Sequence, residues 1–367
     1  MPLTTVARGR VFDWSHAVGR NAARGNGFAY IQTMCLDKGV LYAANAGSEN
    51  NFGMHCNKTK LGANSGEEQW LADFCEYGEG DGKCTWPFGI AVGANGDIFV
   101  SDQWKNEIQV FDNSGKYIRK FGKAGSGDGE LCRPAGLAVE ASGNVIVVDS
   151  GNNRLQVFSP DGKFVGKCGS AGKGEGEFNQ PWGITLDKAG NILVADWKNH
   201  RIQKLSPHGK FLSSIGSYGK LSEPEGSYRV TIFGPFVAGE SEKAGHPRTD
   251  QFNHPTDVAV DTDGDIYVCD WGNHRVCVFD SEGGPVTSLI GDAQVLSAWG
   301  QQTVDANPDM AKARRRVKSL EPQWRFTFPV AVDFDPATDS VIVAEHQRNR
   351  LQVYKKVRNY SDFQANL

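Results

Sequence analysis

Residues 180–216 read QPWGITLDKAGNILVADWKNHRIQKLSPHGKFLSSIG, and this stretch decides the fold. Four short runs rich in β-branched and apolar residues, GITLD, NILVAD, RIQKLS and FLSSIG, follow one another along it. The segments KAGN, WKNH and PHGK separate the runs and are typical of turns and loops. The stretch therefore predicts four short antiparallel strands, which is the unit of a β-propeller blade.

The same pattern recurs along nearly the whole chain. Copies that align without gaps begin at Pro87, Pro134 and Pro181, with a spacing of 47 residues, and further copies begin at Pro255 and Pro329. A degenerate copy begins near Tyr30, where Ile31 stands in the place of the leading proline. Six copies predict one all-β domain over residues 1–367, a six-bladed propeller of four-stranded blades.

The two ends of the chain are predicted to share one blade. The last copy ends after its third strand, LQVYKK, and the N-terminal stretch GRVFDWS resembles a fourth strand. We therefore expect residues 9–15 to complete the sixth blade and to close the ring, which removes an exposed sheet edge.

Three insertions interrupt the repeat. Two long ones fall between blades, at about 217–252 and 290–327, and a smaller one at about 46–70 follows the second strand of the first blade. Within the second long insertion, ANPDMAKARRRVKSLEP predicts a helix that starts at Asn307 as N-cap, with Pro308 in its first turn.

Composition narrows the function classes. Glycine is abundant, 44 of 367 residues, and the formal net charge is -4, which argues against a dedicated nucleic-acid binder. The sequence has no stretch of 18 apolar residues, so we expect no membrane span. The N-terminal residues lack the apolar segment of a secretory signal, so we expect a cytoplasmic protein whose eight cysteines are reduced.

The blade motif closely resembles the NHL repeat. The name-giving triplet stands at Asn199-His200-Arg201 and Asn273-His274-Arg275, with a near copy at Asn152-Asn153-Arg154. The resemblance implies the propeller fold, and similar propellers include peptidyl-α-hydroxyglycine amidating lyases as well as protein- or RNA-binding modules. In those lyases zinc-binding histidines follow the leading proline. The matching positions here hold no histidine, so the zinc site does not carry over; they are Gln32, Phe88, Ala135, Trp182, Thr256 and Val330.

One face of the predicted ring is unusually aromatic. The start of each inner strand and the loop between the second and third strands meet on that face, and both long insertions leave from it. We predict a lidded small-molecule site there. Its predicted substrate-binding residues are Tyr30, Trp86, Phe88, Trp182, Trp197, Trp271 and Phe328. The alternative is that these aromatic residues pack against the insertions as core.

Four residues on this face are candidates for chemistry. His254 and His346 could act as acid–base groups, Glu345 departs from the aspartate that ends the second strand in other blades, and Arg133 could hold a substrate carboxylate. His254, His346 and His16 could instead bind one divalent metal ion, Zn, Fe, Mn or Ca. The alternative for the histidines is that they face solvent or bond to loops. Because His200 and His274 recur at one blade position, we interpret them as structural.

Two functions remain open on the sequence alone. The first is a lyase, hydratase or hydrolase that acts on a small, aromatic or carboxylated molecule. The second is a binding scaffold for a protein or RNA partner, and the run Arg314-Arg315-Arg316 could serve such a partner or be a solvated helix face. The long insertions could also mediate contacts between subunits.

Overall fold

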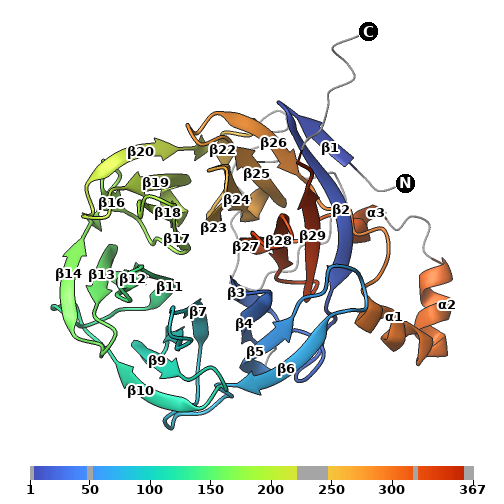
Figure 1. Ribbon diagram of the computed structural model, residues 1–367, viewed down its shortest axis with the longest axis horizontal. Helices are drawn as coiled ribbons and strands as arrows, with labels where there is room; N and C mark the ends of the chain where they lie inside the picture. The colour runs from blue at the N-terminus through green and yellow to red at the C-terminus, as the bar shows by residue number, and fades with distance from the viewer. Residues whose placement is uncertain (1–3, 48–52, 221–246, 317–320, 359–367) are drawn as a thin grey trace.

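The computed structural model describes residues 4–47, 53–220, 247–316 and 321–358, and it confirms a six-bladed β-propeller around a central opening (Figure 1). Blade one consists of β3 (Ile31–Asp37), β4 (Val40–Ala46), β5 (Met54–Lys60) and β6 (Gln69–Phe74). Blade two consists of β7 (Pro87–Val92), β8 (Ile98–Asp102), β9 (Glu107–Phe111) and β10 (Tyr117–Phe121). Blade three consists of β11 (Pro134–Val139), β12 (Val145–Asp149), β13 (Arg154–Phe158) and β14 (Phe164–Cys168).

The remaining blades follow the same antiparallel order. Blade four consists of β17 (Ile184–Leu186), β18 (Ile192–Asp196), β19 (Arg201–Leu205) and β20 (Phe211–Ile215). Blade five consists of β23 (Pro255–Val260), β24 (Ile266–Asp270), β25 (Arg275–Phe279) and β26 (Pro285–Leu289). Short parallel pairs join β15 (Ser170–Ala171) to β16 (Glu177–Phe178), and β21 (Ser217–Tyr218) to β22 (Gln251–Phe252).

Blade six combines the two ends of the chain, as predicted. Its strands are β27 (Pro329–Asp335), β28 (Ser340–Glu345) and β29 (Arg350–Lys356), followed in space by β2 (Arg10–Val18) and β1 (Thr4–Ala7). Strand β2 pairs antiparallel with β29 from Phe12 opposite Lys356 to Val18 opposite Leu351. The N-terminal strand therefore closes the ring, and β1 adds a fifth, outermost strand.

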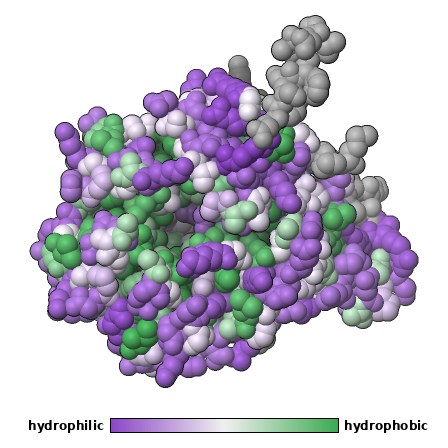
Figure 2. Space-filling model, viewed as in Figure 1, coloured by the Kyte–Doolittle hydropathy of each residue, from purple (hydrophilic) through white to green (hydrophobic). Residues whose placement is uncertain are grey.

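The core lies between neighbouring blades, because alternate side chains of a strand point to opposite faces. In β12, Val145 and Val147 pack against Phe99 of blade two, whereas Ile146 and Val148 pack against Val194 of blade four. Both faces of each blade are thus buried. The opening at the centre of the ring is visible as a hollow with apolar residues around it in Figure 2.

One predicted insertion differs from the structure, and another lies mostly outside the described residues. The range 46–70 contains β5, the third strand of blade one, so the extra residues form only the loops on either side of it. The polar sequence MHCNKTK hid this strand, although its side chains are almost all buried. Most of the insertion at 217–252 lies outside the described residues, which here include only its two ends.

The insertion at 290–327 forms three helices beside the ring, α1 (Ala298–Asp305), α2 (Pro308–Arg316) and α3 (Glu321–Trp324) (Figure 1). Helix α2 is the predicted one, and Asn307 Oδ1 accepts hydrogen bonds from the N–H groups of Asp309 and Met310. The expectation that this insertion is a lid is wrong. Trp299 is buried against Val18 and Phe28 at the outer side of blades six and one, which holds the helices away from the central opening.

Candidate active site on the top face

We call the top face the one on which each inner strand begins and each second strand ends. The acidic residue that ends the second strand is a structural anchor there. In blade three, Asp149 accepts bonds from Arg154 Nε at 2.8 Å, from Gln156 Nε2 at 3.0 Å and from the N–H of Cys132 at 2.7 Å. Asp196 accepts the same three bonds, and Asp270 accepts those from the arginine and from the incoming backbone N–H. The carboxylates thus tie each incoming connection to its own blade.

Glu345 occupies the same position in blade six, and its surroundings give no support to the predicted catalytic role. Its side chain is fully buried and accepts bonds from Arg350 Nε at 2.6 Å, from Gln352 Nε2 at 2.7 Å and from the N–H of Thr327 at 3.2 Å. Burial raises the pKa of Glu345, and Arg350 opposes that rise. The longer side chain substitutes for aspartate in a structural network.

The last residue of the loop between the second and third strands has a second structural role. Its side chain accepts a hydrogen bond from the backbone N–H of the residue before the next inner strand. Asn106 and Asn153 do so for Arg133 and Gln180, both at 2.7 Å. The His200 ring accepts from His254 at 3.1 Å through Nδ1. The His274 ring accepts from Phe328 at 3.2 Å. This confirms the structural interpretation of His200 and His274.

Five of the six residues before the inner strands share a left-handed backbone, with Trp86 as the exception. Tyr30, Arg133, Gln180, His254 and Phe328 all have φ between 50° and 59°. Non-glycine residues rarely adopt this conformation, and the hydrogen bond from the preceding loop holds it in place. These five blades therefore place a different side chain at the same position, directly before the inner strand.

A continuous series of rings crosses the top face from blade two to blade five, and we call it the aromatic row. The Phe88 and Trp182 ring centroids lie 5.1 Å apart, and Trp182 stacks on Trp197 with parallel planes at 4.9 Å. Trp197 lies 4.5 Å from His254, which lies 4.5 Å from His200. Tyr218 follows at 4.7 Å from His200. Four predicted site residues, Phe88, Trp182, Trp197 and His254, are thus brought together.

His254 has the geometry of a neutral base. Its Nδ1 lies 2.8 Å from Asn253 Oδ1, and Asn253 Nδ2 donates to the carbonyl of Gly272 at 3.2 Å, which fixes the amide orientation. Because an amide oxygen only accepts, Nδ1 carries the proton and Nε2 keeps its lone pair. Desolvation lowers the pKa of His254 to about 4, with smaller contributions from His200 and Lys198. Among the described residues no hydrogen-bond partner reaches Nε2.

Three of the other predicted aromatic residues, Tyr30, Trp271 and Phe328, lie in separate groups. Trp271 contacts Phe328 at 4.6 Å, and Phe328 contacts His274 at 4.4 Å. Tyr30 contacts His346 at 5.4 Å. Trp86, by contrast, packs against the same cluster as Phe88 and Trp182, beside the aromatic row. The predicted aromatic residues therefore do not line one common site. Each side chain packs against the blade beside it.

The predicted metal site is not assembled. His346 is buried in contact with blade one, its Nδ1 lies 2.8 Å from the Ile31 carbonyl, and burial lowers its pKa. His16 lies in the middle of β2, in a cavity of about 130 Å³ between blades six and one, and desolvation lowers its pKa to about 4. Within the described part of the chain no three His, Cys, Asp or Glu side chains converge as metal ligands. His254, His346 and His16 contact different parts of the fold, so the three side chains do not form a common metal site.

Two residues of the site were not predicted from the sequence. Asn253 fixes the tautomer of His254, and only its position directly before a histidine could have pointed to this role. Lys198 lies beside the aromatic row, with Nζ 5.8 Å from the Trp197 ring centroid. Arg133, which was predicted, is exposed at the start of blade three, between the blades that supply Phe88 and Trp182.

Comparisons with known proteins agree with this architecture. The family model of the NHL repeat matches residues 178–205 and 252–279, and a family model described as a 6-bladed beta-propeller matches residues 92–148. Protein lin-41 of Caenorhabditis elegans is 38% identical over 50 residues. That match covers 14% of this chain and only 4% of lin-41.

Solved structures share the fold at low sequence identity. A protein of unknown function from Bacteroides thetaiotaomicron VPI-5482 superposes with a TM-score of 0.58 at 15% identity, over 95% of this chain and 76% of that one. A catalytically inactive virginiamycin B lyase from Staphylococcus aureus, with quinupristin, gives 0.52 at 13% identity, over 94% of this chain and all of that one. None of the helices in the described ranges is long and apolar enough to cross a membrane. The chain is a six-bladed β-propeller that carries NHL repeats.

Proposed function

We propose that the chain is an enzyme of the lyase, hydratase or hydrolase class, and that it acts on a small aromatic molecule at the aromatic row. The observation that carries the proposal is His254, a neutral imidazole whose Nε2 is free of hydrogen bonds within the described chain and which adjoins the face of Trp197. The aromatic row would bind the substrate through stacking. Nε2 would accept a proton from substrate carbon or from water.

Similar folds support the class of reaction by analogy only. Virginiamycin B lyase shares the propeller at 13% identity, which is a likeness of fold and not of site. Support for the role of His254 comes instead from its own surroundings, because burial keeps it neutral and Asn253 selects the tautomer with a free Nε2. A base of this kind remains competent down to a pH near its pKa of about 4.

The test is a turnover screen with three proteins: the wild type, His254→Ala and the control His208→Ala. His208 lies in an exposed turn of blade four, on the opposite face. Aryl esters, aromatic lactones and β-substituted aromatic acids are incubated with each protein, and products are measured by mass spectrometry. We expect at least one compound to be consumed by the wild type and by His208→Ala, with a loss of about 10²-fold or more in His254→Ala. Turnover that is unchanged in His254→Ala, or no turnover in the whole panel, contradicts the proposal.

A binding scaffold is the second candidate, and one observation favours it. Trp104 on the top face of blade two is 72% exposed, which is typical of a partner-binding residue more than of an enclosed substrate site. The test is the substitution Trp104→Ala. Loss of binding to a protein or RNA partner, with turnover unchanged, would support this function.

A further inference from the structure

We infer that the aromatic row selects an aromatic anion, and that Arg133 and Lys198 are the residues that determine this specificity. The inference rests on the proposed function only in assuming that the aromatic row binds the substrate. It adds the charge of the ligand, which neither the fold nor the NHL repeats indicate.

The first argument is the charge of the loops that surround the top end of the opening. In blades two to six these loops comprise the residue before each inner strand and the segments 103–106, 150–153, 197–200, 271–274 and 346–349. The equivalent loop of blade one, 47–53, contributes only Gly47 and Gly53 to the described residues. Their described residues include four cationic side chains, Lys105, Arg133, Lys198 and Arg348, and no aspartate or glutamate. The acidic residues behind them are almost completely buried in the structural networks described above. The described loops of blades two to six therefore carry a net positive charge at this end.

The second argument is that two of the four cations are already committed. Lys105 Nζ donates to the carbonyl groups of Glu79 and Lys83, at 3.1 and 2.7 Å. Arg348 Nε donates to Thr327 Oγ1 at 2.7 Å and lies 3.5 Å from Glu345. Arg133 and Lys198 are exposed, and among the described residues no carboxylate forms an ion pair with either. They are the cations available to a ligand.

The third argument is their position relative to the rings. Lys198 directly follows Trp197, and its ammonium lies over the face of that ring. Arg133 directly precedes the inner strand of blade three, and Phe88 and Trp182 pack in one cluster with Ala135 of that strand. Lys198 therefore lies at the aromatic row, and Arg133 lies on the same face in the blade between those that supply Phe88 and Trp182. His254 Nε2 offers a lone pair, so an anionic group would be directed away from it and towards Arg133 and Lys198.

The test uses two probes of the same shape and different charge, cinnamate and cinnamamide. Their dissociation constants are measured by calorimetry at pH 7 for the wild type, for the double variant Arg133→Gln/Lys198→Gln and for Trp197→Ala. Lys210→Gln, an exposed lysine in a turn on the opposite face of blade four, is the matched control. Circular dichroism melting checks that each variant folds.

We expect the wild type and Lys210→Gln to bind cinnamate about 10-fold more tightly than cinnamamide. The ratio should fall towards 1 in the double variant and in 1 M salt, while the affinity for cinnamamide stays unchanged. Trp197→Ala should weaken the binding of both probes.

Equal affinities of the wild type for the two probes, with both weakened by Trp197→Ala, would overturn the inference and leave the binding site standing. A preference for cinnamate that persists in the double variant would also overturn it. Binding that is absent, or insensitive to Trp197→Ala, would overturn both the inference and the assumption that the aromatic row binds the substrate. The turnover measured for His254→Ala tests the enzymatic function separately.

Discussion

At the scale of single residues, recurrence at one blade position distinguishes structural residues from candidate catalytic residues. His200 and His274 stand where Asn106 and Asn153 stand in other blades, and all four accept the same backbone hydrogen bond. His254 differs, because its position holds a different side chain in every blade and no structural bond uses its ring Nε2. A residue that departs from the repeat is therefore the better candidate for function.

Substitutions at His274 test the structural role. His274→Asn keeps an acceptor for the N–H of Phe328 and suits the left-handed backbone, whose φ is 55° at this residue. We expect it to change the free energy of unfolding by less than about 0.5 kcal/mol. His274→Ala removes the acceptor and should cost about 1–3 kcal/mol, because it leaves the partly buried N–H group of Phe328 unpaired. Urea denaturation measures both, and an alanine variant as stable as the asparagine variant would contradict the role.

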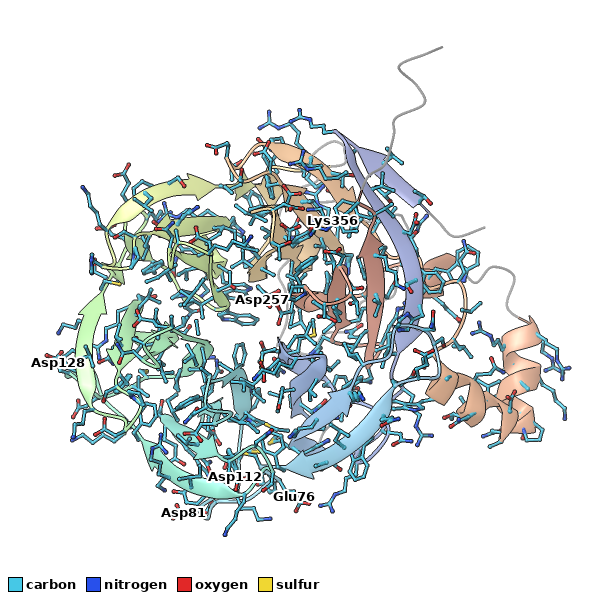
Figure 3. All side chains as sticks on the ribbon, viewed as in Figure 1. Glu76, Asp81, Asp112, Asp128, Asp257 and Lys356 are labelled. Atoms are coloured by element: carbon cyan, nitrogen blue, oxygen red, sulfur yellow. The ribbon has the colours of Figure 1, made fainter. Side chains whose placement is uncertain are left out.

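At the scale of elements, the inner strands decide how closely blades approach one another. The N–H of Gly136 donates to the carbonyl of Trp182 at 2.9 Å, and a Cβ at Gly136 would lie only 2.5 Å from that oxygen. Blade five holds Asp257 where blades two to four hold glycine, beside the central opening (Figure 3). Asp257 Oδ1 fills the space beside Gly183, and Oδ2 accepts from the N–H of Val332 at 3.0 Å. The glycines of the Pro-x-Gly motif thus make room for the neighbouring blade.

The two glycines Gly136 and Gly166 give a matched pair for this point. Gly136→Ala should destabilise the protein by about 1–3 kcal/mol, because backbone atoms must move to relieve the contact with Trp182. At Gly166, in the outer strand β14, an added Cβ would meet no atom within 4 Å. Gly166→Ala should therefore be neutral or slightly stabilising. Thermal and urea unfolding compare the two, and equal effects would contradict the explanation.

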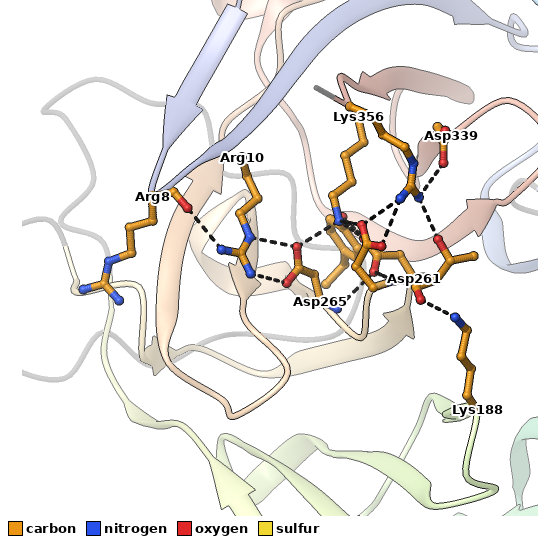
Figure 4. Close-up of polar contacts among 11 residues, drawn as sticks. Arg8, Arg10, Lys188, Asp261, Asp265, Asp339 and Lys356 are labelled. Carbon is orange, nitrogen blue, oxygen red and sulfur yellow. Dashed lines mark hydrogen bonds and ion pairs between the residues drawn. The ribbon is translucent and has the colours of Figure 1, made fainter. Parts of the chain in front are cut away.

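At the scale of the whole molecule, an ionic network at the face opposite the site connects the strands that close the ring to blade five (Figure 4). Lys356, at the end of β29, is 7% exposed and binds three aspartates of the β23–β24 turn. Its Nζ lies 2.5 Å from Asp261, 2.8 Å from Asp263 and 2.9 Å from Asp265. Arg10 of β2 also binds Asp265, at 2.9 Å. The network joins both ends of the chain to blade five.

Removal of Lys356 tests the network. Lys356→Met would leave buried carboxylates without their main partner, and we expect it to destabilise the fold by about 3–5 kcal/mol at pH 7. Lys356 lowers the pKa of Asp263 below its ordinary value. This stabilisation is therefore present at neutral pH and is lost as the pH falls through the lowered pKa, so wild type and variant should converge in acid.

The matched control is Lys163→Met, which breaks an exposed ion pair with Asp161 and should not measurably change stability. Chemical denaturation as a function of pH compares the three proteins. A Lys356→Met variant with wild-type stability at pH 7 would show that the network does not hold the ring closed.

The sequence by itself determined the fold, because each blade repeats a local pattern of short apolar strands and turns. Six copies of that pattern, and a fourth strand supplied by the N-terminus, were enough to predict the ring and its closure. It also determined that His200 and His274 are structural, since their recurrence is visible in the repeat. Helix α2 and its Asn307 cap were predictable for the same reason, because capping depends on neighbouring residues.

Only the tertiary structure decided which site residues meet. The sequence placed the aromatic residues on one face and therefore predicted one common site. The direction of each side chain, however, depends on the blade that packs beside it. The structure therefore unites Phe88, Trp182, Trp197 and His254, and separates them from His346 and His16. It also places the helical insertion beside the ring, because burial of Trp299 depends on contacts with β2 that no local pattern encodes.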